Sequence, residues 1–243
     1  WLGFSRYRAS DQLLERLLYG MISGLLASFL IVILGITIDY RAILIIWPIA
    51  IVLMLFNQRY LCFSYGAGII SLTSLIFGWP DIDVSAIIAL VGILHLMESI
   101  LIYFDGYKSS IPVYMEHSRF NPIGAYLMQK MWPIPLVVLV IPDTAAQLSG
   151  GGVNMPSWWP IFQPEGVGGM LAILPIVAIL GYGDVAITQV PKDRAKHSGL
   201  ILGLYSVIVL TLAVISSRIY WVKYLAAISM PVLHELIIIR GKW

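Results

Sequence analysis

A histidine and a glutamate lie in the middle of one apolar stretch, as His95 and Glu98 within Leu94-His95-Leu96-Met97-Glu98. At a spacing of i and i+3 the two side chains share one face of a helix. Ionisable groups inside an apolar helix are costly and usually face the interior of a bundle, where they find a partner. Two interpretations stay open: a polar pair that holds helices together, or a site that binds an ion or handles a proton.

A second polar pair, His234 and Glu235, stands near the end of the last apolar stretch. It matches the beginning of the zinc-protease motif His-Glu-x-x-His, but Ile238 occupies the position of the second histidine. The pair is therefore predicted to be a helix-end polar pair. The single cysteine, Cys62, cannot form an internal disulfide. Because the sequence also contains no nucleophile triad, CxxC or glycine-rich nucleotide motif, we expect no enzyme, no cofactor and no metal centre.

Polar residues between the apolar stretches form two further candidate sites. Asp105 and Gly106 follow the stretch that contains His95, and an Asp-Gly pair is typical of a turn. Lys108 comes two residues later, and Lys192, Arg194 and Lys196 form a basic run further on. We expect these residues to lie in cytoplasmic loops and to contact a protein partner or anionic lipid headgroups.

The composition indicates an integral membrane protein. Of 243 residues, 59% are hydrophobic and 12% are charged, whereas soluble domains are roughly 45–50% apolar and about 25% charged. The mean hydropathy is +0.88. A net charge of +2 gives no basic surface for nucleic acid. These values predict a multi-pass protein of the plasma membrane.

The apolar stretches predict an all-α bundle. A bilayer requires about 20 apolar helical residues for each crossing. Seven stretches are clear candidates and an eighth, at 124–142, is weaker because it contains Pro133 and Pro135. The seven clear stretches are 17–38, 42–56, 61–78, 84–104, 168–187, 199–216 and 219–239.

The distribution of basic residues favours eight crossings with both termini in the cytoplasm. With that topology only Arg41, Arg218 and Lys223 of the fifteen Lys and Arg residues lie outside, and the other twelve lie inside. An excess of Lys and Arg on the cytoplasmic side is the expected pattern for short loops. We therefore predict about eight spanning helices.

Several short patterns resemble one family of bacterial membrane proteins. They include Phe77-Gly78-Trp79-Pro80, the segment around His95 and Glu98, Trp132-Pro133-Ile134-Pro135, Gly181-Tyr182-Gly183-Asp184 and Pro231-Val232-Leu233-His234-Glu235. Together they resemble the membrane region of Firmicutes proteins that carry a C-terminal PDZ domain, the MinJ-like family. The resemblance implies that residues 1–243 are one transmembrane domain within a longer chain, followed by a cytoplasmic PDZ domain.

Two functions follow as expectations. The first is a membrane scaffold or anchor that positions a PDZ domain and recruits other proteins, as the resemblance implies for the cell-division site. Its expected partners are the lipid bilayer, membrane or membrane-associated proteins and a second copy of the chain. The alternative is a transporter or channel-like subunit that uses His95 and Glu98 within a polar path.

Overall fold

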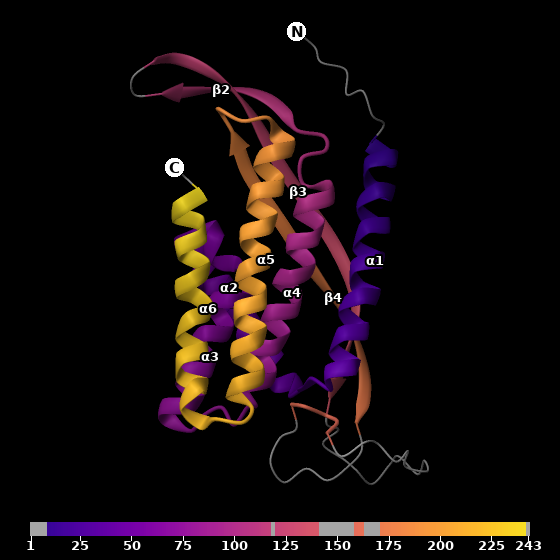
Figure 1. The fold of residues 1–243 in the computed structure, drawn as a ribbon, viewed down its shortest axis with the longest axis vertical. Helices are drawn as coiled ribbons and strands as arrows, with labels where there is room; N and C mark the ends of the chain where they lie inside the picture. The colour runs from indigo at the N-terminus through magenta and orange to yellow at the C-terminus, as the bar shows by residue number, and fades with distance from the viewer. Residues whose placement is uncertain (1–8, 118–119, 141–157, 163–170, 242–243) are drawn as a thin grey trace.

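The structure, a computed structural model, describes residues 9–117, 120–140, 158–162 and 171–241. Helices and long strands run side by side along one long axis (Figure 1). In chain order the elements are α1 (Ala9–Leu34), β1 (Thr37–Ile38), α2 (Tyr40–Phe56), the 3-10 helix η1 (Gln58–Leu61), α3 (Phe63–Phe77), α4 (Val84–Asp105), β2 (Ile111–His117), β3 (Phe120–Val140), β4 (Ala172–Ala186), α5 (Pro191–Ser216) and α6 (Tyr220–Gly241).

Helix α4 forms the centre of the molecule, and most of its side chains are buried. The carboxylate of Asp83 begins the helix by accepting hydrogen bonds from the backbone N–H groups of Ser85 and Ala86. Helix α5 packs closely along α4 at Gly199, where an added Cβ would lie 3.0 Å from the backbone oxygen of Ser99. The hydroxyl of Ser99 donates a hydrogen bond to the backbone oxygen of Gly199. Such small-residue contacts are typical of helices packed in membranes.

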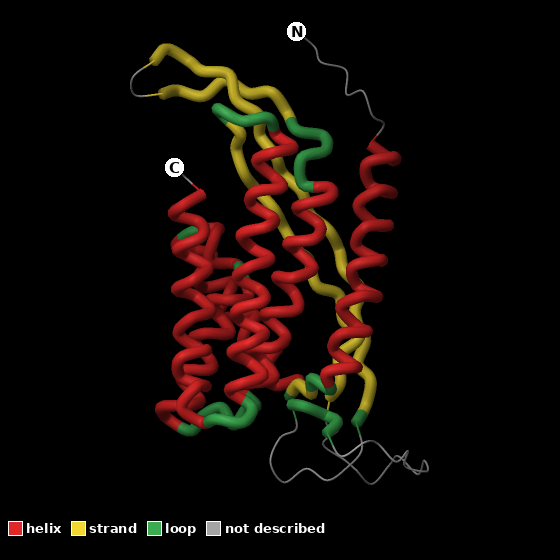
Figure 2. Tube along the Cα trace, in the orientation of Figure 1, coloured by secondary structure: helices red, strands yellow, loops and turns green. Residues whose placement is uncertain are grey.

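A long hairpin of β3 and β4 crosses the molecule between the central helices and α1 (Figure 2). The two strands pair antiparallel from Tyr126 opposite Ala186 to Val140 opposite Ala172. The other edge of β3 pairs antiparallel with β2 near one end and parallel with the short β1 at the other. Between those two pairings, the edge of β3 is covered by helix α1.

Two glycines of α1 allow this helix to lie directly on the backbone of β3. A Cβ added at Gly20 would lie 2.0 Å from the backbone oxygen of Pro133, and one added at Gly24 equally close to that of Pro135. Proline has no N–H to donate and is confined to strand edges. Pro133 and Pro135 therefore suit the edge that faces α1, and the ladder to β4 stays intact.

One backbone donor on this edge is satisfied by a serine of α1. The backbone N–H of Val137 donates a 2.9 Å hydrogen bond to the hydroxyl oxygen of Ser28. That hydroxyl in turn donates to the backbone oxygen of Gly24. An apolar medium contains no water to bind backbone N–H and C=O groups. A strand can therefore lie among the apolar helices only if its edge is covered in this way.

The all-α bundle of about eight spanning helices is wrong. Stretch 124–142 lies mostly in β3, and stretch 168–187 contains β4. In the described part of the chain, four helices (α1, α4, α5 and α6) are long and apolar enough to cross a membrane, while α2 and α3 are shorter apolar helices. Hydropathy measures apolar content and not backbone geometry, so a short apolar run fits a buried strand as well as a helix.

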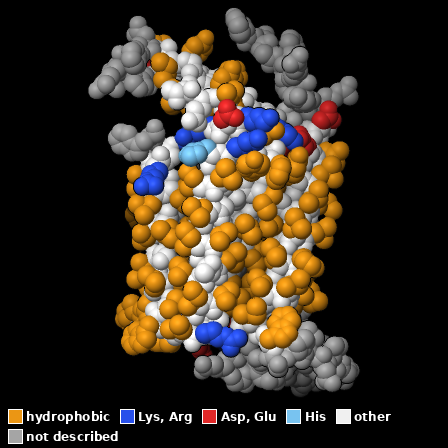
Figure 3. All heavy atoms as spheres, in the orientation of Figure 1, with side chains coloured by type: hydrophobic (Ala, Val, Ile, Leu, Met, Phe, Trp, Pro, Cys, Tyr) orange, Lys and Arg blue, Asp and Glu red, His pale blue; other side chains and the backbone are white. Residues whose placement is uncertain are grey.

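The outer surface of the helices is apolar along most of its height. Large hydrophobic side chains such as Leu25, Phe29, Leu204 and Trp221 are more than half exposed. Figure 3 shows hydrophobic side chains over the middle of the visible face and charged ones gathered at the upper and lower rims. A soluble monomer rarely exposes so much contiguous apolar surface. The surface and the four long helices indicate association with a membrane.

Candidate functional site

Three chemically reactive side chains meet beside the central helix. Cys62 precedes the first turn of α3, His95 lies in the middle of α4, and His234 lies toward the end of α6. The Sγ atom of Cys62 lies 3.1 Å from Nε2 of His95 and 3.4 Å from Nε2 of His234. We call these three residues the thiol–imidazole cluster. His95 is buried, and the other two side chains are half-buried.

The protonation of His95 follows from its partner on the backbone. Its Nδ1 atom lies 2.8 Å from the backbone oxygen of Val91, one turn earlier on α4. A carbonyl oxygen only accepts, so Nδ1 carries the hydrogen and Nε2 presents its lone pair to Cys62. Both ring nitrogens of His95 are therefore engaged by groups other than Glu98.

The protonation of His234 follows from a longer chain of contacts. Arg59 forms a 3.1 Å ion pair with Glu235. The hydroxyl of Tyr65 donates a 2.6 Å hydrogen bond to the same carboxylate. Having used its hydrogen there, the Tyr65 oxygen accepts from Nδ1 of His234 at 3.3 Å. His234 consequently also turns an unprotonated Nε2 toward Cys62.

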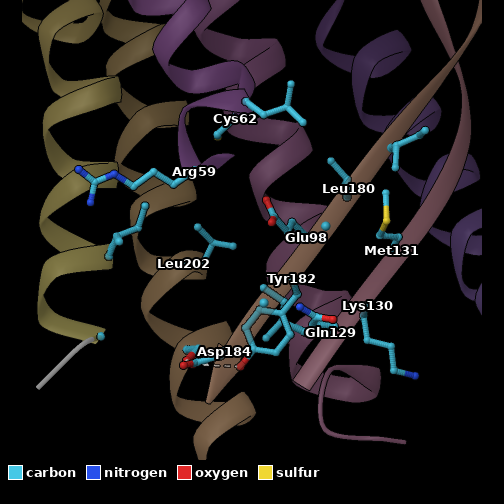
Figure 4. A pocket seen from close by; sticks show the side chains of 18 of the residues that line it. Arg59, Cys62, Glu98, Gln129, Lys130, Met131, Leu180, Tyr182, Asp184 and Leu202 are labelled. Atoms are coloured by element: carbon cyan, nitrogen blue, oxygen red, sulfur yellow. Dashed lines mark hydrogen bonds between the residues drawn. The ribbon is translucent and has the colours of Figure 1, made fainter. Parts of the chain in front are cut away.

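The cluster opens onto a cavity of about 2770 Å³ between the helices and the hairpin. Glu98 lines the same cavity as Cys62, His95 and His234. Figure 4 shows Glu98, Cys62 and Leu180 of β4 among the side chains that line this cavity. Glu98 lies one helical turn from His95 on the same face of α4.

A second polar group joins the end of α4 to β3. Asp105 is completely buried, accepts a 2.9 Å hydrogen bond from the indole N–H of Trp132 and lies 3.3 Å from the ammonium of Lys130. Lys108 approaches the same carboxylate at 3.5 Å and pairs with Glu15 of α1 at 2.6 Å. Asp105 thus holds α1, α4 and β3 together, at the turn that Gly106 begins.

Lys108 shows how these contacts alter ionisation at the end of α4. Partial burial lowers the pKa of Lys108, but its hydrogen bonds to Glu15 and Tyr19 raise it, as does the charge of Asp105. The net result is a pKa above the ordinary value of 10.5 for lysine. The ammonium is therefore charged throughout the neutral pH range.

A third polar group joins β4 to α5. Arg194 binds both carboxylate oxygens of Asp184, at 2.9 and 3.1 Å, and also contacts the backbone oxygen of Gly241. Ser198 donates a further 2.9 Å hydrogen bond to Asp184. The second and third polar groups lie at the end of the molecule where α4 ends and α5 begins, which we call the charged end (Figure 1).

Two predicted contact residues remain on the outside of the charged end. The ammonium of Lys192 lies 5.9 Å from the ring centre of Tyr107, and that of Lys196 lies 5.2 Å from that of Tyr103. Lys192 is exposed and Lys196 half-buried. The side chains of Lys192 and Lys196 can therefore contact a partner at the surface, whereas Asp105 and Arg194 are paired with other residues of the protein.

The structure brings together residues that the sequence analysis treated separately. His95 and His234 come from different predicted pairs and meet at Cys62, which the sequence analysis had considered only for disulfides. Arg59, Tyr65 and Asp184 were not predicted as site residues at all. The residue type of Cys62 could have indicated this contact. In a chain with few polar residues, a single thiol has few possible polar partners other than histidines.

The fold and its polar clusters define an apolar, membrane-associated helical protein with an inserted β-hairpin. Among curated proteins, the chain is similar to the cell division topological determinant MinJ of Bacillus subtilis (strain 168), with 28% identity over 130 residues. The match covers 52% of this chain and 29% of MinJ, so the similarity spans less than a third of that relative. No family model matches the sequence, and no solved structure shows significant similarity to it.

Proposed function

We propose that this chain is the membrane-embedded part of a scaffold that helps to determine where a cell divides. The observation that carries the proposal is the similarity to the division determinant MinJ over half of the chain. In the full-length protein this part would hold a cytoplasmic PDZ domain at the plasma membrane, and the role would be one of binding without catalysis. The apolar surface and the four long helices support a position in the membrane.

The charged end is the surface that suits a protein partner. Its fixed groups, Asp105 and the Asp184–Arg194 pair, are held by several elements and form a rigid base. Lys192 and Lys196 lie on the outside of these fixed groups and present positive charge to a partner. A membrane-associated division protein with an acidic surface would complement them.

The location of the protein tests the proposal most directly. A fluorescent fusion of the full-length protein, expressed at its native level in the cells that make it, is expected to accumulate at division septa. Deletion of the gene is expected to displace septa from their usual positions. A fusion spread evenly over the membrane, together with unchanged septum positions after deletion, would contradict the proposed function.

Charge reversal tests the proposed partner surface. The double change Lys192→Glu and Lys196→Glu is expected to lower the recovery of division proteins with the tagged full-length protein. Lys223→Glu is the matched control, because Lys223 lies near the start of α6, at the opposite end of the molecule. If vesicles with anionic lipid lose binding while protein recovery is unchanged, the surface contacts headgroups and the partner assignment is wrong.

One observation favours a transporter or channel-like subunit as a second candidate. The large cavity places Glu98, an ionisable side chain, at the level of the apolar helices. Ion or proton flux through purified protein in sealed vesicles, lost in Glu98→Gln, would support this function. Septal localisation with no flux would favour the scaffold.

A further inference from the structure

The thiol–imidazole cluster has one hydrogen too few for the acceptors that it contains. Nε2 of His95 and Nε2 of His234 both direct lone pairs at Cys62, as their Nδ1 contacts require. A thiol has a single hydrogen to donate, so it satisfies only one of the two nitrogens. The other nitrogen is left facing sulfur without a donor, and a buried acceptor without a partner is costly.

We propose that Cys62, His95 and His234 bind a transition-metal ion of the Zn²⁺ type. A cation removes the conflict because all three atoms then act as donors of electron pairs to one centre. All three ligand atoms lie within 4.8 Å of one another, and the two sulfur–nitrogen distances are 3.1 and 3.4 Å. A tetrahedral zinc site with its usual bond lengths separates such ligand atoms by about 3.4–3.7 Å.

The ligand types determine the class of ion. One thiolate and two imidazoles suit Zn²⁺ and neighbouring transition metals, whereas Mg²⁺ and Ca²⁺ prefer oxygen ligands. On binding, the metal–sulfur bond forms and the thiol proton leaves to solvent, so the ion and its three ligands carry one net positive charge. Glu98 lines the same cavity. The cavity also leaves a fourth coordination position open to water or to a ligand.

The surroundings of the two histidines resemble the outer shell of a metal site. Metal-binding histidines usually donate their second N–H to a backbone carbonyl, a carboxylate or another polar group, which fixes the ring. His95 does so to Val91, and His234 does so to Tyr65, which is itself tied to Glu235. The ring of Tyr205 packs edge-on against His95, with 5.2 Å between ring centres, and further restricts its orientation.

Metal content of the purified full-length protein tests the proposal. The protein is stripped with a chelator, loaded with Zn²⁺, desalted and measured by elemental analysis. We expect one equivalent of zinc in the wild type and none in Cys62→Ser, a change of one atom that preserves the shape of the site. Tyr65→Phe keeps all three ligands and is expected to weaken zinc affinity by about 10- to 100-fold.

His197→Ala provides the matched control, since His197 is exposed on α5, away from the cluster. It is expected to bind zinc as the wild type does. Loading with Co²⁺ adds an independent readout, because an absorption band from cobalt–thiolate bonding that disappears in Cys62→Ser is assigned to Cys62, the single cysteine of residues 1–243. Zinc binding that survives Cys62→Ser, competition by Mg²⁺ or Ca²⁺ at equal concentration, or a wild type that binds no zinc would each overturn the proposal. These outcomes are independent of whether the protein localises to septa.

Discussion

The sulfur of Cys62 lies 3.4 Å from Nε2 of His234, although 172 residues separate the two along the chain. The contact connects the beginning of α3 to the end of α6, and His95 of the central helix meets the same sulfur. One side chain therefore joins three helices at a single point. The relative positions of α3, α4 and α6 depend on this contact and on a small number of others like it.

The hydroxyl of Tyr205 makes another such contact, and its removal is expected to destabilise the protein. Tyr205 donates to the backbone oxygen of Met230 and shares a 2.8 Å hydrogen bond with Ser64. The change Tyr205→Phe leaves both groups buried without this partner, so the free energy of unfolding should fall by about 1–3 kcal/mol. Denaturation in detergent measures this loss. Tyr114→Phe, at a side chain that is 86% exposed, should change stability little; equal losses would refute the prediction.

The contact between α1 and β3 is expected to be intolerant of any side chain. At Gly24 a Cβ would clash with the backbone oxygen of Pro135, and backbone cannot move aside as a side chain can. Gly24→Val is expected to cost about 1–3 kcal/mol, the usual cost of overpacking, and to loosen the hairpin. Leu25→Val adds the same side chain on the exposed side of α1 and serves as control. Limited proteolysis and thermal melts compare the two variants, and similar melting temperatures would contradict the packing described.

Neutralisation of Asp105 is expected to be more harmful than loss of a surface charge. Asp105→Asn leaves the buried ammonium of Lys130 without its counterion, and breaking a buried pair in this way costs about 3–5 kcal/mol. Addition of Lys130→Met should restore much of the loss, because no buried charge then remains. Asp193→Asn, at an exposed position on α5, is the control. A double variant that is no more stable than Asp105→Asn alone would contradict this account.

Replacement of Arg194 by lysine is expected to destabilise the junction of β4 and α5. The guanidinium binds both oxygens of Asp184, which the single ammonium of lysine cannot reproduce. Arg194→Lys should lower the free energy of unfolding by about 1–2 kcal/mol. Lys192→Arg tests the exchange in the opposite direction at an exposed position. Indistinguishable thermal melts of Arg194→Lys and the wild type would show that the two-oxygen contact contributes nothing.

The sequence predicted the long apolar helices more accurately than the strands of the hairpin. Stretch 84–104 matches α4 (Val84–Asp105), and stretch 219–239 matches α6 (Tyr220–Gly241) almost residue for residue. Length and continuous hydropathy are sufficient there, because a long apolar segment has few alternatives to a helix. The hairpin was mistaken for two helices, although Pro133 and Pro135 are spaced so that both fall on one edge of a strand.

The candidate site was predictable only in part, for a similar physical reason. The spacing of His95 and Glu98 correctly places both on one face of α4, and both line the same cavity. Spacing reports only on neighbours within one helix, so it suggested that His95 would pair with Glu98. The partners of His95 instead include Cys62, which comes from a different element, and contacts of that kind depend on how helices pack.

The cover that α1 provides for β3 has a consequence for how the protein is made. A strand edge with free backbone groups is a template for pairing with other chains. Synthesis proceeds from the N-terminus, so the glycine face of α1 and the hydroxyl of Ser28 already exist when β3 leaves the ribosome. The order of the elements thus protects the nascent hairpin from aggregation. A circular permutant with α1 moved to the end of the chain would lose that protection during translation while keeping every contact of the finished fold.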